Sequence, residues 1–235
     1  MKRFLIVLTM VTVFATTAQA QFLNFGVRVG TGFATHVDDL ADNSPILAAN
    51  VGGFVTYGFT QSASMLADVF RLQTGVNIIR RGCKFQEVLE MAMSIREGSY
   101  DAWYAQIPLL ATIRYELPIR EPGHYALLSV GPAVSIGMIG TVKDRKFTRG
   151  LPQGDWNYLK NESAFNVMNR IDANLLFGVG YEYQDLSIML QLDYGFMAVT
   201  ETPDAIESLN GANAKVPMGN NMALLLTVGY QFPFR

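Results

Sequence analysis

The sequence predicts an all-β protein, an eight-stranded antiparallel up-and-down β-barrel that spans a membrane. Apolar and polar residues alternate in eight segments, which is the pattern of strands with one apolar and one polar face. Only 16% of the 235 residues are charged, below the ~25% typical of soluble domains. The connections between the segments alternate between long and short, as the loops and turns of transmembrane barrels do.

The N-terminus has the features of a secretory signal. Two basic residues precede an apolar run, and Ala18-Gln19-Ala20 provides a small-x-small cleavage site. A membrane anchor is the alternative, but the run is shorter than the ~20 residues that a spanning helix requires. We therefore expect a signal peptide at residues 1–20 and an outer-membrane β-barrel domain at residues 21–235.

In each of the eight expected strands, every second residue belongs to the apolar face. In the first, Phe25, Val27 and Val29 oppose Gly26 and Arg28. The apolar face takes the odd-numbered residues of 25–33, 47–57, 105–116 and 170–182, and the even-numbered residues of 71–78, 128–137, 186–196 and 222–232.

One stretch also allows a helix. Residues 125–142 are uncharged and number eighteen, but they contain Gly131-Pro132, Gly137 and Gly140, which weaken or break a helix. Because the surrounding pattern has a period of two, a strand is favoured here.

The polar face distinguishes a membrane barrel from a soluble lipocalin-like barrel. A surface facing water would carry many lysines, whereas the polar face here carries Gly, Ser, Asn, Gln and a few charged residues, which suits a cramped interior. Every lysine after residue 20 falls in an expected loop: Lys84, Lys143, Lys146, Lys160 and Lys215. The apolar face is therefore expected to contact lipid.

The connections and the aromatic residues support the same orientation. Long outer loops are expected at residues 36–45, 81–100, 140–169 and 200–220, and short periplasmic turns at Gln61, 120–123 and 184–185. Aromatic rings favour the headgroup level of a membrane. The expected girdles comprise Tyr57, Phe59, Tyr115, Tyr181, Tyr230 and Phe232 at the periplasmic ends, with Trp103 and Phe196 at the other rim.

A set of charged residues is expected inside the barrel. Buried charges need partners, so we expect one paired network of Arg28, Arg71, Arg114, Arg170, Glu116, Asp172 and Asp193. An ion path or gated plug is one interpretation. A structural polar core is favoured, because side chains just fill the interior of an eight-stranded barrel.

The longest expected loop is a candidate contact surface. Its basic residues would hold lipopolysaccharide phosphates and its aromatic residues an envelope protein partner; a solvated loop is the alternative. The residues concerned are Lys143, Arg145, Lys146, Trp156 and Tyr158.

Chemistry that would make an enzyme is sparse. His36 lies near Asp38, Asp39 and Ser44 at the outer rim, where a general base of a rim enzyme acting on lipid or peptide would sit. Neither His36 nor His124 has a partner at metal-ligand spacing. We therefore expect no enzymatic activity, no cofactor and no metal, and a net charge of −2 argues against nucleic acid.

Several strings resemble the PorT-like outer-membrane β-barrel family of Gram-negative bacteria. The most specific are Ile-Pro-Leu-Leu at residues 107–110 and Gly-Val-Gly-Tyr-Glu at residues 178–182, and the others are at residues 25–30, 72–73, 80–82, 131–132 and 226–232. The family usually has an acid where this chain has Gln106 and often a lysine where it has Thr112. The chain also ends in Phe234-Arg235 instead of an aromatic residue.

The resemblance implies an integral outer-membrane barrel with a structural or accessory role. One member of the family is tied to a dedicated protein-secretion pathway, which suggests secretion or envelope maintenance. The expected partners are outer-membrane lipid and lipopolysaccharide, the barrel-assembly machinery during folding, and an envelope protein. A narrow channel for small solutes and a rim enzyme remain alternatives.

Overall fold

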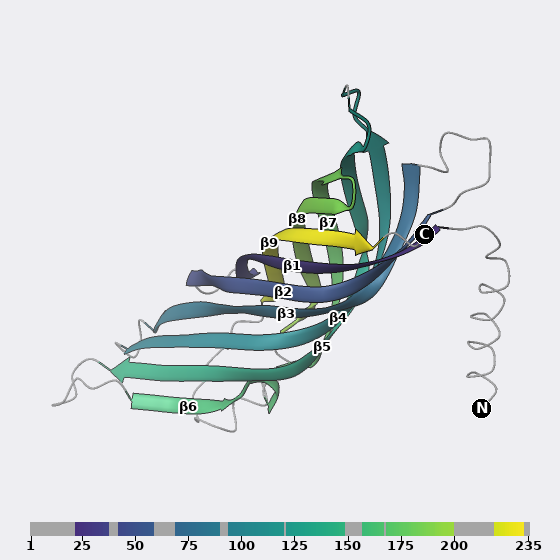
Figure 1. Cartoon of the computed structure of the whole chain (residues 1–235). Coiled ribbons are helices and arrows are strands. Elements are labelled where there is room, and N and C mark those ends of the chain that lie inside the picture. Colours follow the sequence, from purple (N-terminus) through teal and green to yellow (C-terminus); the bar gives the residue numbers. More distant parts are fainter. Residues whose placement is uncertain are drawn as a thin grey trace, which may run out of the picture.

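The computed structural model describes residues 22–37, 42–58, 69–89, 94–119, 121–148, 157–166, 168–199 and 219–232 (Figure 1). The proposed signal peptide, Phe59 and Trp156 lie outside these residues. The strands are β1 (Phe22–Val37), β2 (Asp42–Gly58), β3 (Phe70–Leu89), β4 (Ser94–Glu116), β5 (His124–Thr148), β6 (Asn157–Ser163), β7 (Ile171–Tyr183), β8 (Leu186–Ala198) and β9 (Asn220–Phe232), with one 3₁₀ turn, η2 (Ala164–Asn166).

Eight of these strands close into a barrel, as the sequence predicts. Each strand pairs antiparallel with its neighbours in the order β4-β3-β2-β1-β9-β8-β7-β5, and β5 pairs with β4 to complete the ring. The first and last strands, β1 and β9, pair from Phe25 opposite Phe232 to Val37 opposite Asn220. β6 lies outside the ring, because it pairs with the far end of β5.

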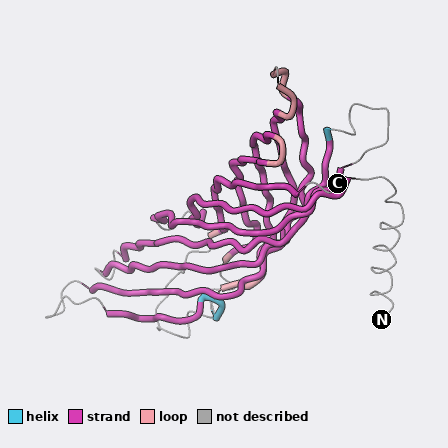
Figure 2. The backbone as a smooth tube through the Cα atoms, in the orientation of Figure 1, coloured by secondary structure: helices cyan, strands magenta, loops and turns pink. Residues whose placement is uncertain are grey.

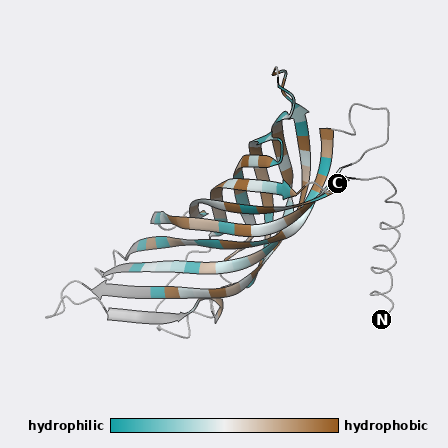
Figure 3. Cartoon of the chain, in the orientation of Figure 1, coloured by the Kyte–Doolittle hydropathy of each residue, from teal (hydrophilic) through white to brown (hydrophobic). Residues whose placement is uncertain are grey.

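The alternation of side chains divides the wall into an apolar outside and a largely polar inside. Along β7, exposed Leu175, Phe177 and Val179 alternate with buried Asn174 and Leu176. Figure 3 shows the same alternation of brown and teal along the ribbons. An exposed apolar face around a filled interior is the arrangement of a barrel surrounded by lipid.

The stretch considered as a helix is part of β5, where Gly131 and Pro132 pair with Leu176 and Leu175 of β7. Among the described residues, no helix is long and apolar enough to cross a membrane.

The wall is much taller on one side than on the other. β7, β8 and β9 have 13 residues each, whereas β3, β4 and β5 have 20, 23 and 25. About 9–11 residues suffice for a strand to cross a bilayer. The tall strands therefore extend beyond the membrane, and they reach farther to the left in Figures 1 and 2.

The structure corrects three of the expected loops. The segment 36–45 is mostly strand, because β1 ends at Val37 and β2 begins at Asp42. The segment 81–100 is mostly strand, because β3 and β4 pair as far as Leu89 opposite Ser94. The segment 140–169 contains the end of β5 and all of β6. Apolar alternation stops where the wall leaves the lipid, but backbone pairing continues.

The connections β2–β3, β4–β5 and β7–β8 lie at the opposite end of the barrel, which we call the short-turn end after the turn between β7 and β8. β7 and β8 are joined by the tight turn at Gln184-Asp185, in which Gln184 has a φ of 54°. β4 and β5 are joined by residues 117–123, where Gly123 has a φ of 99°. The connection at Gln61 is longer than expected, since β2 ends at Gly58 and β3 begins at Phe70.

The lipid-facing wall can be tested at two depths of one strand. Leu190 lies mid-strand between Val179 and Leu226, whereas Leu186 begins β8 between Tyr183 and Tyr230. We expect Leu190→Arg to lower the free energy of unfolding by about 2–4 kcal/mol and Leu186→Arg by about 0–1 kcal/mol, because a charge costs most at mid-membrane. Urea unfolding in lipid vesicles measures both, and equal costs would contradict a lipid-facing wall.

Candidate functional site in the barrel interior

Arg81 is the centre of a buried ion cluster. Its side chain points inward from β3 and is 1% exposed. It forms ion pairs with Asp193 of β8 and, at 3.4 Å between Nη1 and Oδ2, with Asp172 of β7. Because β8 lies four strands from β3 in either direction around the ring, the Arg81–Asp193 pair spans the interior from wall to opposite wall.

Amide side chains hold the two carboxylates in place. Asn174 and Asn221 each donate to Asp172 Oδ2 at 3.0 Å, and Gln106 donates to Asp193 Oδ2 at 2.8 Å. Gly195 leaves room for Asp172, since a Cβ on this glycine would lie 2.5 Å from Asp172 Oδ2. The cluster thus connects β3, β4, β7, β8 and β9.

A second ion cluster lies toward the short-turn end. The Nε of Arg114 donates to Glu182 Oε1 at 2.8 Å, and its Nη2 lies 2.6 Å from the same oxygen. Arg71 Nη1 is 4.0 Å from this oxygen. The guanidinium of Arg114 also lies over the ring of Tyr125.

A small apolar patch on β4, β5 and β7, the Leu110 patch, lies between the two clusters. Leu110, Ala133 and Leu176 pack together, and all three are buried. On β4, Leu110 stands between Gln106 of the first cluster and Arg114 of the second. Side chains from these three adjacent strands therefore fill one side of the interior between the clusters.

Comparison with known proteins gives the family. The family model for the outer membrane protein beta-barrel domain matches residues 17–201, which is most of the chain. The chain belongs to the outer membrane protein beta-barrel domain family. A search of curated proteins finds no match.

Solved structures give loose overlaps with other membrane barrels. The N-terminal β-barrel domain of OprF from Pseudomonas aeruginosa is 13% identical, with 88% of this chain and 97% of that chain covered and a TM-score of 0.33. Neisserial surface protein A has 12% identity, coverages of 88% and 97% and a TM-score of 0.34. A major outer membrane protein of Thermus thermophilus has 13% identity, coverages of 89% and 99% and a TM-score of 0.41. The family assignment rests on the family model.

In this outer-membrane barrel, the charges expected in the interior lie at two places inside the barrel and on its surface. Arg28, Asp172 and Asp193 are buried, and Arg71 and Arg114 are partly buried beside Glu182. The expectation of a single network is therefore corrected to two clusters, with the Leu110 patch between them on β4, β5 and β7.

Two of the expected members are wrong. Arg170 is exposed in the turn before β7, where its guanidinium lies 5.6 Å from the Phe165 ring centroid. Glu116 is exposed because it is the last residue of β4. Both residues have the parity of the inner face, but they sit beyond the ends of the enclosed interior.

Sequence reasoning misses the residues that hold each cluster together. Arg81 follows the last apolar residues of its strand and falls in an expected loop, whereas β3 continues to Leu89. The sequence does contain one signal for Arg81. It lies two residues after Ile79 and four after Asn77, and both of these also point inward. Glu182 has the inner parity but is not among the expected interior charges.

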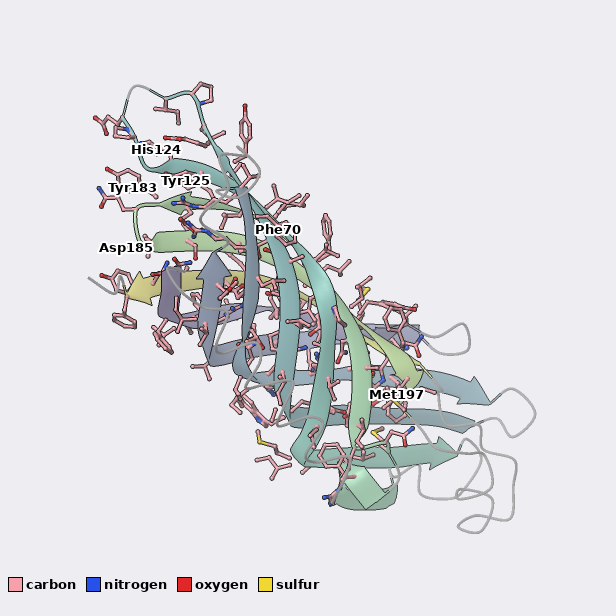
Figure 4. The ribbon with its side chains drawn as sticks, turned by 90° about the vertical axis from the view of Figure 1, so that its right-hand side faces the viewer. Phe70, His124, Tyr125, Tyr183, Asp185 and Met197 are labelled. Carbon is pink, nitrogen blue, oxygen red and sulfur yellow. The ribbon has the colours of Figure 1, made fainter. Side chains whose placement is uncertain are left out.

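The expected girdle aromatics lie at the two ends of the outer wall. Tyr115, Tyr181, Phe196, Tyr230 and Phe232 are exposed, and Tyr57 and Trp103 are partly buried. Figure 4 labels His124, Tyr125 and Tyr183 at the short-turn end. There His124 stacks on Tyr183 with ring centroids 4.5 Å apart and pairs through Nδ1 with the Tyr181 hydroxyl.

The expected partner loop is partly a β5–β6 hairpin. Lys143 is exposed on β5, and the backbone places Arg145 opposite Tyr158 and Lys146 opposite Asn157. The side chains of Arg145, Lys146 and Tyr158 lie outside the described set.

A row of donors crosses the outer face of the tall strands. Ser44 lies opposite Lys84, Lys84 opposite Ser99, and Ser99 opposite Lys143, across β2, β3, β4 and β5. Both lysines are exposed. We call these four residues the donor row, because hydroxyl and ammonium groups alternate along it.

An ion pair and apolar residues border the donor row on the membrane side. Arg80 Nε donates to Asp101 Oδ1 at 2.8 Å on the outer face. Ile139, the neighbour of Trp103 on β5, is 68% exposed. The donor row therefore stands where the lipid-facing wall gives way to a polar surface.

His36 is not a rim residue in this structure. It lies in β1 with its side chain inside the barrel, 6% exposed and against the ring of Tyr100, with centroids 5.1 Å apart. Asp38 and Asp39 lie outside the described residues. Within the described part of the chain, no group of three or more His, Cys, Asp or Glu side chains is arranged to hold a metal.

The first ion cluster can be tested by removing its cation. We expect Arg81→Met to lower the free energy of unfolding by about 3–5 kcal/mol, because two buried carboxylates lose their counter-charge. Arg170→Met, at an exposed arginine, is the matched control and should cost little. The triple variant Arg81→Met/Asp172→Asn/Asp193→Asn should recover most of the loss in urea unfolding; a triple variant as unstable as Arg81→Met would contradict the assignment.

Proposed function

We propose that this outer-membrane barrel is a non-enzymatic structural or accessory component, exported by a cleaved signal peptide and serving protein secretion or envelope maintenance. The observation that carries the proposal is the Arg81–Asp193 pair, which joins opposite walls of a barrel whose interior is filled by buried side chains. A filled interior leaves the rims and the outer wall as the surfaces that act. The PorT-like strings supply the secretion alternative.

The tall side of the wall supports a role in contact. Strands β3 to β6 extend past the short strands and present a continuous sheet above the membrane. The sheet ends at β6, which pairs with β5 on one side. An envelope protein is the proposed partner of this extension, and the barrel-assembly machinery is proposed to act during folding.

Lipopolysaccharide is proposed as the lipid partner. The donor row offers two ammonium groups and two hydroxyls at the upper edge of the lipid-facing wall, the level at which headgroup phosphates lie. Phosphate oxygens accept strong hydrogen bonds from such charged donors.

The channel alternative makes an opposite prediction for conductance. If the interior is a structural core, purified protein in planar bilayers should give no ion-conducting steps, and Arg114→Ala should give none either, because the Arg81–Asp193 pair still crosses the interior. Steps in the wild type, or their appearance in Arg114→Ala, would favour the narrow channel.

Site-specific photocrosslinking in intact envelopes tests the accessory role. A photoreactive residue at Ser99 should capture lipopolysaccharide, and one at Tyr158 should capture one reproducible envelope protein. The same residue at Gln184, in the short-turn end, is the matched control and should capture neither. An empty result at both Ser99 and Tyr158 would count against the accessory component.

A further inference from the structure

The short-turn end of the interior carries an excess of positive charge. Arg28, Arg71 and Arg114 point inward from β1, β3 and β4, and Glu182 is the carboxylate that the latter two share. Glu116, on the same side of β4, is exposed. Among the residues that the structure describes at this end, three guanidinium groups therefore stand beside one enclosed carboxylate.

Arg28 is buried without a counter-charge among the described residues. Its side chain is 6% exposed, and its Nε and Nη2 have no hydrogen-bond partner there. The guanidinium lies 4.5 Å from the centroid of the Phe54 ring, which covers one of its faces. A guanidinium stays protonated in proteins, so its N–H edge presents an unmatched positive charge.

The free edge of Arg28 borders a small cavity. The cavity has a volume of about 20 Å³, and Gln73, Ser187 and Thr227 also line it. A neighbouring cavity of about 30 Å³ shares Phe54, Gln73 and Ser187 and is lined by Arg71 and Glu182. The two cavities together provide room for a small ion but not for a sugar or a peptide.

We propose that these cavities form a binding site for a small anion, the size of a halide or a short carboxylate, that enters from the short-turn end. Arg28 donates to it through Nε and Nη2, Gln73 and the hydroxyls of Ser187 and Thr227 line it, and Arg71 adds attraction. The anion completes the interior by giving Arg28 the counter-charge that Glu182 gives Arg114. The proposed function does not depend on this site.

Water alone is the competing occupant, and the two differ in measurable ways. Water can satisfy the hydrogen bonds of Arg28 but not its charge. If water alone fills the cavities, the stability of the protein should not depend on which anion the buffer contains. An anion that binds only the folded protein raises its melting temperature, and the rise grows with the logarithm of the anion concentration once the site is filled.

Bromide NMR on the purified full chain in neutral detergent tests the proposal. Bromide that exchanges with a protein site gives a broader line, so wild-type protein should broaden the signal. Arg28→Met should return the line to that of protein-free detergent, whereas Arg170→Met should match the wild type. Acetate at equal ionic strength should compete and narrow the wild-type line.

Thermal unfolding provides a second measurement, which compares the melting temperature of the same protein in two buffers. Wild-type protein should melt at a higher temperature in bromide than in a buffer whose only anion is the bulky sulfonate HEPES, and Arg28→Met should melt at the same temperature in both. If Arg28→Met fails to fold, as judged by heat-modifiable migration, the wild-type comparison and acetate competition still decide. A wild-type line as narrow as the blank, or Arg28→Met as broad as the wild type, would overturn the proposal.

Discussion

The ion pairs of Arg81 are the interaction on which the rest of the barrel depends. A closed sheet of eight strands has an interior that side chains must fill, and here one long cation on β3 reaches carboxylates on β7 and β8. Amides from β4, β7 and β9 fix those carboxylates. Five of the eight wall strands thus contribute to the contacts around one guanidinium. The same contacts hold opposite walls at a fixed distance and neutralise the buried charges.

This arrangement also determines where function can reside. The Arg81 cluster crosses the interior, and the Leu110 patch fills one side of it next to that cluster. A solute would have to break a buried ion pair and displace packed apolar side chains to pass. The surfaces that remain are the tall extension of β3 to β6, the donor row below it and the small cavities at the opposite end.

The sequence predicts the membrane-spanning part well, because lipid imposes a strict period of two on every strand. β7 shows this directly, since its exposed residues are those that the alternation assigns to lipid. Outside the membrane the constraint is absent, so the charged ends of β3, β4 and β5 look like loops. The register places Glu87 opposite Arg96 and Glu97 opposite Arg145, cross-strand pairs of opposite charge that are visible only when the strands are aligned. Arg81 escapes prediction for the same reason, whereas Asp172 and Asp193 lie within the regular alternation.

Two adjacent arginines give β3 a cation on each face of the wall. Arg80 points outward to Asp101, and Arg81 points inward to Asp172 and Asp193. A shift of one residue exchanges the faces of a strand, so Arg80 would turn inward as Arg81 turned outward, and each face would still carry one arginine. The same shift would turn the buried amide of Asn77 toward lipid and the lipid-facing Val76 into the polar interior. The arginines therefore supply charge to either face of the wall, whereas the residues before them in β3 fix which alignment the barrel accepts.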